Sequence, residues 1–264
     1  MKKHLIVNQK KIFYTDSGSG KAVVLLHGYL ESKEIWNDFS KELSRSFRVI
    51  CIDIPGHGES ETLSEKHSMH QLAASIDETL NQLKVDNCFM IGHSMGGYVT
   101  LMFHELYSEK LLGFSLFHSH PYADTSETIK KRLREIELVK DGKKNLIAKF
   151  DIPNAFATDN LTKFKKEIEE ATQIALKTPR NGIVANLNAM MERPHLPESL
   201  KNTKIPFLYI AGKNDNYIDF ENVASKIQLP PKSQFCILEE SGHMGFIEEK
   251  EKSIKIISQF LNNL

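Results

Sequence analysis

The sequence has few cysteines, no net charge and no long apolar run, and each absence narrows the class of protein. Its three cysteines, Cys51, Cys88 and Cys236, lie far apart in apolar stretches without C-x-x-C spacing, so we expect buried free thiols rather than a disulfide framework. The 34 basic and 34 acidic residues balance, which argues against nucleic acid or an anionic membrane as the partner. The N-terminal stretch has only a short apolar patch, Leu5–Val7, so we expect a cytoplasmic protein without a signal peptide or membrane span.

Short apolar runs of strand length recur along the 264 residues. Each run is nearly continuous rather than alternating, which is typical of strands buried on both faces of a parallel sheet. The segments Leu5–Val7 and Ile12–Tyr14 also predict an antiparallel hairpin at the sheet edge. The predicted buried strands are Val23–Leu26, Val49–Ile52, Phe89–Ile91, Phe114–Phe117, Phe207–Ile210 and Phe235–Leu238.

Helical patterns separate these strands. Ser68 and Gln71 fit a capping box that opens a helix, and the following apolar residues recur on one stripe as far as Leu83. The tail 250–264 also has one apolar face. Strand and helix alternate, so the sequence predicts an α/β fold: a doubly wound, mostly parallel central sheet with an antiparallel N-terminal hairpin.

The alternation stops between residues 120 and 197, where we find no convincing strand. Helical patterns cover Ser126–Lys140, Leu161–Lys177 and Gly182–Met191. We therefore expect residues 1–119 and 198–264 to form the α/β core and residues 120–197 to form a helical cap over the carboxyl ends of the strands.

A short motif follows the predicted strand Phe89–Ile91. The pentapeptide Gly92–Gly96 fits G-x-S-x-G, in which glycines allow a serine to sit on a sharp strand-to-helix turn. An ordinary glycine-rich turn is the alternative, because short motifs recur by accident. If Ser94 is a nucleophile, it needs a histidine base, and that histidine needs an orienting carboxylate.

His243 is the candidate base, since it follows a flexible Ser-Gly step and precedes the last helix. Asp215 is the favoured carboxylate, because it follows the strand Phe207–Ile210 and a glycine. Asp124 and Asp219 are its competitors, although Asp124 precedes Thr-Ser and fits helix-start chemistry.

The order Ser94, Asp215, His243, with the motif in mid-chain, resembles the α/β-hydrolase superfamily, in particular serine carboxylesterases with a helical cap. The resemblance spans nearly the whole chain. It rests on five motifs in order: Leu25–Tyr29, Asp53–Ser60, Gly92–Gly96, Gly212–Asp215 and Ser241–His243.

The resemblance implies a role for each matching residue. Ser94 is the nucleophile, His243 the general base and Asp215 the group that fixes the imidazole tautomer. The backbone N–H groups of Tyr29 and Met95 form the oxyanion hole. The chain lacks the H-G-G-G loop of some lipases, so we do not expect it to accept bulky tertiary-alcohol esters.

For the remaining candidate residues, we predict roles from their positions in the sequence alone. His27 and His57 are expected to brace backbone, and His93 to pack beside the sheet. We find no histidine pair with metal-ligand spacing, and we expect no metal and no cofactor. The predicted substrate-binding residues are His118, His120, Phe150, Phe156, Met190 and Met191, in addition to Tyr29 and Met95 of the oxyanion hole.

We therefore expect a serine hydrolase that cleaves small, mostly apolar carboxylic esters through an acyl-enzyme, as a monomer or homodimer whose partner is a small-molecule substrate. A hydrolase of carbon–carbon bonds or thioesters in small metabolites would use the same three residues. A relative that binds ligand without catalysis is the hypothesis of a different class, and an intact triad argues against it.

Overall fold

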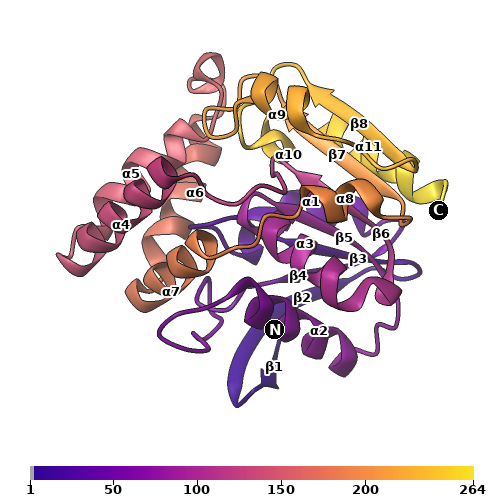
Figure 1. The fold of residues 1–264 in the computed structure, drawn as a ribbon, viewed down its shortest axis with the longest axis horizontal. Helices are drawn as coiled ribbons and strands as arrows, with labels where there is room; N and C mark the ends of the chain where they lie inside the picture. Colours follow the sequence, from indigo (N-terminus) through magenta and orange to yellow (C-terminus); the bar gives the residue numbers. More distant parts are fainter. Residues whose placement is uncertain (1–2) are drawn as a thin grey trace.

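One central sheet organises the molecule. The computed structural model describes residues 3–264. The first two residues of the N-terminal stretch, where we expect no signal peptide, lie outside the described residues. Within that range the sheet has eight strands in the order β1-β2-β4-β3-β5-β6-β7-β8 (Figure 1). The strands are β1 (Lys3–Val7), β2 (Lys10–Ser17), β3 (Ala22–Leu26), β4 (Arg48–Ile52), β5 (Cys88–His93), β6 (Leu111–Phe117), β7 (Phe207–Gly212) and β8 (Ser233–Leu238).

The strand directions confirm the predicted fold class. β1 pairs antiparallel with β2, and β2 pairs antiparallel with β4. Every further pair, from β4 through β3, β5, β6 and β7 to β8, is parallel. The protein is therefore an α/β fold with a mostly parallel sheet and an antiparallel N-terminal hairpin.

Helices flank the sheet. The capping box predicted at Ser68 is present at the start of α2. α2 packs against α3, and α1 packs against α11. In the part of the chain that the structure describes, no helix is both long and apolar enough to cross a membrane. The helices are α1 (Asn37–Leu43), α2 (Met69–Gln82), α3 (Met95–Tyr107), α4 (Ser126–Lys140), α5 (Lys144–Asn154), α6 (Lys165–Lys177), α7 (Arg180–Met191), α8 (Pro197–Asn202), α9 (Phe220–Lys226), α10 (Gly245–Glu248) and α11 (Lys250–Asn262).

Burial follows the predicted pattern in the middle of the sheet but not at its edge. All residues of β3, β5 and β7 are buried. β8 is an edge strand, and most of its residues are only half-buried or exposed, so the expectation of burial on both faces is wrong there. All three cysteines are free as expected, although Cys236 on β8 is half-buried.

The segment between β6 and β7 is helical, as the sequence predicts. α4 packs against α7, and α5 packs against α6. Figure 1 shows these four helices grouped on the left, beside the sheet. Two details differ from expectation: α5 was not predicted, and α6 begins at Lys165 rather than Leu161. The sequence does not predict α5 because Gly142 precedes this helix and Pro153 lies near its end, and both residue types are typical of loops.

Candidate active site

The parallel register brings several loops to one edge of the sheet. Leu26 of β3 lies opposite Gly92 of β5, and His93 of β5 lies opposite Phe117 of β6. The carboxyl ends of β7 and β8 lie beside them in the same sheet. Ligands of open α/β sheets bind at this edge, so the structure gathers the predicted motifs where an active site is expected.

Ser94 occupies a strained turn between β5 and α3. Its backbone has φ +50° and ψ −116°, in a region that non-glycine residues rarely adopt. A Cβ atom on Gly92 would lie 2.3 Å from the carbonyl oxygen of Gly96, and one on Gly96 would lie 2.4 Å from that of Leu26. Only glycine fits at both positions. Ser94, between them in the turn, is half-buried.

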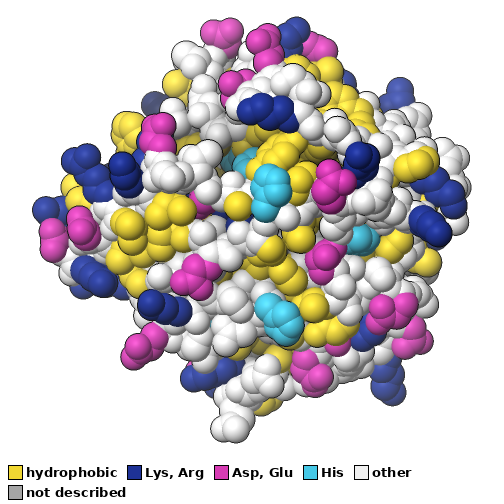
Figure 2. Space-filling view, viewed as in Figure 1, with side chains coloured by type: hydrophobic (Ala, Val, Ile, Leu, Met, Phe, Trp, Pro, Cys, Tyr) yellow, Lys and Arg dark blue, Asp and Glu magenta, His cyan; other side chains and the backbone are white. Residues whose placement is uncertain are grey.

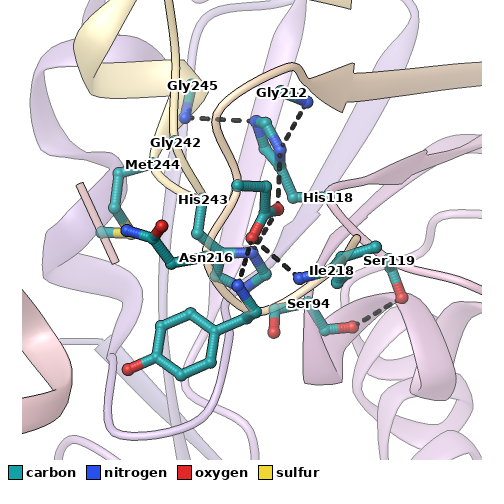
Figure 3. A network of polar contacts seen from close by, with 12 residues as sticks. Ser94, His118, Ser119, Gly212, Asn216, Ile218, Gly242, His243, Met244 and Gly245 are labelled. Atoms are coloured by element: carbon teal, nitrogen blue, oxygen red, sulfur yellow. Dashed lines mark hydrogen bonds and ion pairs between the residues drawn. The ribbon is translucent and has the colours of Figure 1, made fainter. Parts of the chain in front are cut away.

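Hydrogen bonds fix the Ser94 backbone in that conformation. Its N–H donates to the carbonyl oxygen of Phe117 over 3.0 Å. Its carbonyl oxygen accepts from the hydroxyl of Ser119 over 2.8 Å (Figure 3). Because both partners lie on or after β6, the neighbouring strand supports the turn.

Asp215 and His243 form a close pair above this turn. Asp215 Oδ2 lies 2.7 Å from His243 Nδ1, and the two side chains are 2% and 8% exposed. The other oxygen, Oδ1, accepts from the N–H groups of Tyr217 and Ile218 over 2.8 and 3.0 Å. The carboxylate is therefore fixed from both sides, with one oxygen held by two backbone N–H groups and the other at Nδ1 of His243.

Electrostatics favour a charged carboxylate and a basic imidazole. Burial alone raises the pKa of Asp215, but its contacts with His243 and His118 outweigh burial and hold this pKa well below its usual value. Burial alone lowers the pKa of His243, and the Asp215 charge outweighs that effect, so the pKa lies above its ordinary value of 6.5. His243 therefore has the character of a general base.

The competing aspartates have other partners. Asp124, whose side chain is 1% exposed, binds Arg132 over 2.6 Å and also binds Arg193. Asp219 caps α9 by accepting from the N–H of Asn222 over 3.1 Å. Of the three candidates, the structure places Asp215 beside His243.

His118 lies beside the Asp215 carboxylate. It is fully buried with φ +48° at the end of β6. Its Nδ1 lies 3.4 Å from Asp215 Oδ2 and 3.0 Å from Gly212 N, and Gly245 N–H donates to Nε2 over 3.2 Å (Figure 3). Burial lowers the pKa of His118 to about 4. The structure therefore places His118 against the Asp215 carboxylate, and a contact of His118 with substrate stays an untested prediction.

Side-chain ligand atoms of His118, Asp215 and His243 lie within 4.8 Å of one another, a separation that would also suit a metal ion. The Asp215 oxygens already accept from two backbone N–H groups and one imidazole. That saturation favours a hydrogen-bonded catalytic network over a metal site, and the absence of a metal stays a prediction.

The oxyanion role of Met95 and Tyr29 stays a prediction, and the structure shows where their two N–H groups lie. Met95 is the first residue of α3, where the N–H has no acceptor within the helix. The N–H of Tyr29, in the loop after β3, has no hydrogen-bond acceptor among residues 3–264. The same loop is braced as expected, because Ile54 N–H donates to His27 Nε2 and Leu30 N–H donates to His57 Nε2.

The predicted pocket residues divide into three groups. Phe150 is 72% exposed on α5, so its assignment to the pocket is wrong: the helix turns that face to solvent. Phe156 and Met190 are buried among the insertion helices. Met191 and His120 are half-buried, and burial lowers the pKa of His120 to about 4.

Comparison with known proteins identifies the same fold. The alpha/beta hydrolase fold family matches residues 21–250. This chain belongs to that family. The hydrolase is 25% identical over 269 residues to the AB hydrolase superfamily protein YisY of Bacillus subtilis, covering 96% of each chain. It is 27% identical over 256 residues to a putative 2-succinyl-6-hydroxy-2,4-cyclohexadiene-1-carboxylate synthase of the same organism, covering 93% of this chain and 92% of that protein.

A solved structure is also similar to this hydrolase. The thermophilic esterase of Thermogutta terrifontis superposes with a TM-score of 0.94 and 27% identity, covering 100% of this chain and 98% of the esterase. Family membership and these relatives support a hydrolytic enzyme.

Sequence reasoning missed several polar residues of this hydrolase near the site. The Tyr29 hydroxyl donates to Glu135 of α4. The Tyr217 hydroxyl donates to the carbonyl oxygen of Asp151 on α5 over 2.8 Å, and the Tyr217 ring lies 5.2 Å from that of His243. Burial raises the pKa of Glu135 to about 7 and that of Asp151 to about 6. Nothing in the amphipathic pattern of α4 distinguishes Glu135, because its partner is 106 residues away.

Proposed function

We propose that this hydrolase is a serine carboxylesterase that cleaves small uncharged esters through an acyl-enzyme on Ser94. One arrangement carries the proposal: the buried Asp215 carboxylate 2.7 Å from His243, at the sheet edge where Ser94 occupies a strained turn. The similarity to an esterase over the whole chain supports the same function.

The proposed reaction has two halves. Ser94 Oγ attacks the ester carbonyl carbon while its proton passes to His243 Nε2, and the carbonyl oxygen becomes an oxyanion that the N–H groups of Tyr29 and Met95 stabilise. The intermediate collapses as His243 gives that proton to the departing alcohol. Water then attacks the acyl-enzyme with His243 again as base, and the acid and free Ser94 are released.

The charges near the site favour a neutral substrate. Two arginines of the insertion, Arg132 and Arg193, are both paired with Asp124. Carboxyl groups from α4 and α5, Glu135 and Asp151, border the tyrosines of the site instead. A substrate carboxylate would lose hydration there without gaining a cationic partner.

We propose that residues 120–197 form the cap over this site. The contacts of Tyr29 with α4 and of Tyr217 with α5 join the insertion to two active-site loops. Arg193 also lies 4.0 Å from the ring of Tyr98 on α3, at the other side of the turn. A cap held at these points limits the length of acyl chain that enters.

Active-site labelling tests the proposal. A fluorophosphonate should add to the folded protein once, and peptide mass spectrometry should find the adduct on Ser94. The Ser94→Ala variant should bind no label and lose nearly all hydrolysis of a nitrophenyl ester, while its circular dichroism stays that of the wild type. Ser44→Ala is the matched control, since that hydroxyl donates to the carbonyl oxygen of Lys41 over 3.0 Å at the exposed end of α1.

Two outcomes would redirect the assignment. Label on another residue, or none on folded protein, would contradict the serine mechanism and favour a ligand-binding relative. Labelled protein that hydrolyses thioesters or carbon–carbon bonds, but no simple ester, would keep the triad and replace the substrate class.

A further inference from the structure

The histidine that precedes the proposed nucleophile has an unusual set of partners. His93 is fully buried. Its Nδ1 lies 3.0 Å from Glu31 Oε2, and its Nε2 lies 2.9 Å from the backbone carbonyl oxygen of His243. Both ring nitrogens therefore face oxygen atoms.

These partners determine where protons can sit. A backbone carbonyl only accepts hydrogen bonds, so Nε2 of His93 must carry a proton. Glu31 Oε2 also accepts from the N–H of Gly28 over 2.6 Å, as an ionised carboxylate does. An ionised Glu31 only accepts, so Nδ1 must carry a proton as well, whereas a neutral imidazole has one N–H.

We infer that His93 is a buried imidazolium, paired with the Glu31 carboxylate, that positions the catalytic loops of this hydrolase. This positioning role rests on the proposed function, whereas the charge state does not. Burial alone raises the pKa of Glu31, yet the His93 contact and the Gly28 N–H bring it below its ordinary value, consistent with the ionised form.

His27, in the loop after β3 that also carries Glu31, provides a contrast. Its Nδ1 lies 2.7 Å from the carbonyl oxygen of Gly28, while its Nε2 accepts from the N–H of Ile54 over 3.0 Å. One acceptor and one donor suit a neutral ring with a proton on Nδ1, and burial lowers the pKa of His27. Two buried histidines near the same carboxylate, Glu31, are thus held in different charge states by their partners.

The pair joins three segments of the site. Glu31 holds the N–H of Gly28, directly before the proposed oxyanion donor Tyr29. His93 is bonded covalently to Ser94 and holds the carbonyl of the base, His243. A Cβ on Gly28 would lie 2.9 Å from His93 Nδ1, so the oxyanion loop packs directly on the ion pair.

The charge balance also matters during the proposed reaction. The rings of His93 and His243 are 4.9 Å apart by centroid, so two imidazolium ions become neighbours when His243 takes the serine proton. Glu31 offsets that repulsion. The other titratable groups that face His93 are His118, 6.1 Å away by ring centroid, and His27 behind Glu31, and burial lowers the pKa of both.

Nitrogen NMR on wild-type protein labelled with ¹⁵N-histidine tests the charge state directly, without any activity. At about pH 8, where free histidine is neutral, both His93 nitrogens should show the shifts of protonated imidazolium, whereas His27 should show one protonated nitrogen. The signals are assigned with His93→Asn and His27→Asn. A His93 ring with one protonated nitrogen at this pH would overturn the inference, because the proton would then reside on Glu31.

Glu31→Gln tests the positioning role. The neutral amide cannot balance a buried cation, so His93 should lose one proton and one of its two hydrogen bonds. We expect kcat for the nitrophenyl ester to fall at least 10-fold with KM within about 2-fold, since the loss concerns alignment rather than substrate contact. Glu34→Gln, in the same loop and outside the pair, should keep wild-type values. If His93 is doubly protonated in the wild type and loses a proton in Glu31→Gln, an unchanged kcat in that variant would refute the role.

The two proposals fail separately. Wild-type protein with an imidazolium at His93 but no esterase activity would refute the proposed function and leave the charge assignment intact. Active protein with a neutral His93 would do the reverse. If Glu31→Gln does not fold, the wild-type NMR measurement still decides the charge state.

Discussion

Asp215 is the single side chain whose replacement we expect to have the most specific effect on catalysis. In Asp215→Asn the amide would donate to His243 and hold the imidazole in the wrong tautomer, so kcat should fall by about 10³- to 10⁴-fold. Because the amide keeps the size of the carboxylate, the variant should still fold. Steady-state kinetics and a thermal melt measure both effects.

Asp124→Asn is the comparison, because this competitor pairs with Arg132 and Arg193 instead. Removing its charge leaves the buried Arg193 and the half-buried Arg132 without their carboxylate partner, so the free energy of unfolding should fall by roughly 3 kcal/mol. Its kcat should stay within a few-fold of wild type. A crippled Asp124→Asn with an active Asp215→Asn would reverse the assignment of the triad acid.

The pH profile depends on His243. A general base must be neutral in the free enzyme, so kcat/KM should rise with pH through the pKa of this residue. Since Asp215 raises that pKa, the midpoint should lie above 6.5, the value that the sequence alone predicts from free histidine. A midpoint below 6.5 in the hydrolysis of a neutral ester would contradict the structure. His118 should not add a second step above pH 5, since its pKa is about 4.

At the scale of strands and helices, the sequence predicts what depends on local pattern. Continuous apolar runs identify the strands, and parallel strands bring their carboxyl ends to one edge, so the sequence predicts Ser94, Asp215 and His243 at that edge. The structure places Asp215 beside His243. The edge position of β8 and the helix α5 were not predictable in this way, because they depend on which neighbour a segment finds.

The same reason explains which site residues were missed. Glu31 and Glu135 meet their partners across 62 and 106 positions of sequence. No spacing rule joins such residues, because a hydrogen bond between distant segments is decided by tertiary packing. His118 is a candidate from its place at a strand end, yet that place does not predict its contact with Asp215.

The cap helices set the expected chain-length preference. Large exposed apolar side chains of the insertion include Leu133, Leu146 and Phe150 on α4 and α5, and Figure 2 shows hydrophobic atoms gathered on that side of the molecule. These side chains are exposed to solvent. We expect the proposed cap to limit the length of the acyl chain. On nitrophenyl esters, kcat/KM should rise from acetate to about butyrate or hexanoate, by roughly 0.8 kcal/mol for each methylene that fits, and then fall.

Comparing a charged ester with a neutral ester provides a second test of the proposed cap. A hemisuccinate ester should react far more slowly than a butyrate ester, and Glu135→Gln should narrow that difference, since it removes a carboxyl group beside Tyr29. A preference for long chains, or for the charged ester, would contradict a short neutral pocket.

For the whole molecule, buried neutral histidines link stability to pH. Burial lowers the pKa of each of these groups, so the unfolded chain binds protons that the folded chain does not, and stability must fall as pH falls below 6.5. The histidines concerned are His27, His57, His67, His104, His118 and His120. His243 acts in the opposite direction, because its raised pKa stabilises the fold at low pH and that contribution is lost as pH rises.

We expect acid sensitivity, because six histidines act in this direction, against His243 and the proposed His93 imidazolium. His118 alone, with a pKa of about 4 against 6.5 unfolded, should remove about 2 kcal/mol of unfolding free energy between pH 7.5 and pH 5. Thermal melts across this range should show the midpoint falling steadily. His118→Asn should be less stable at pH 7.5 but should lose less on acidification, because its side chain takes up no proton. A midpoint that stays constant down to pH 5 would mean that the buried imidazoles are already charged in the folded protein.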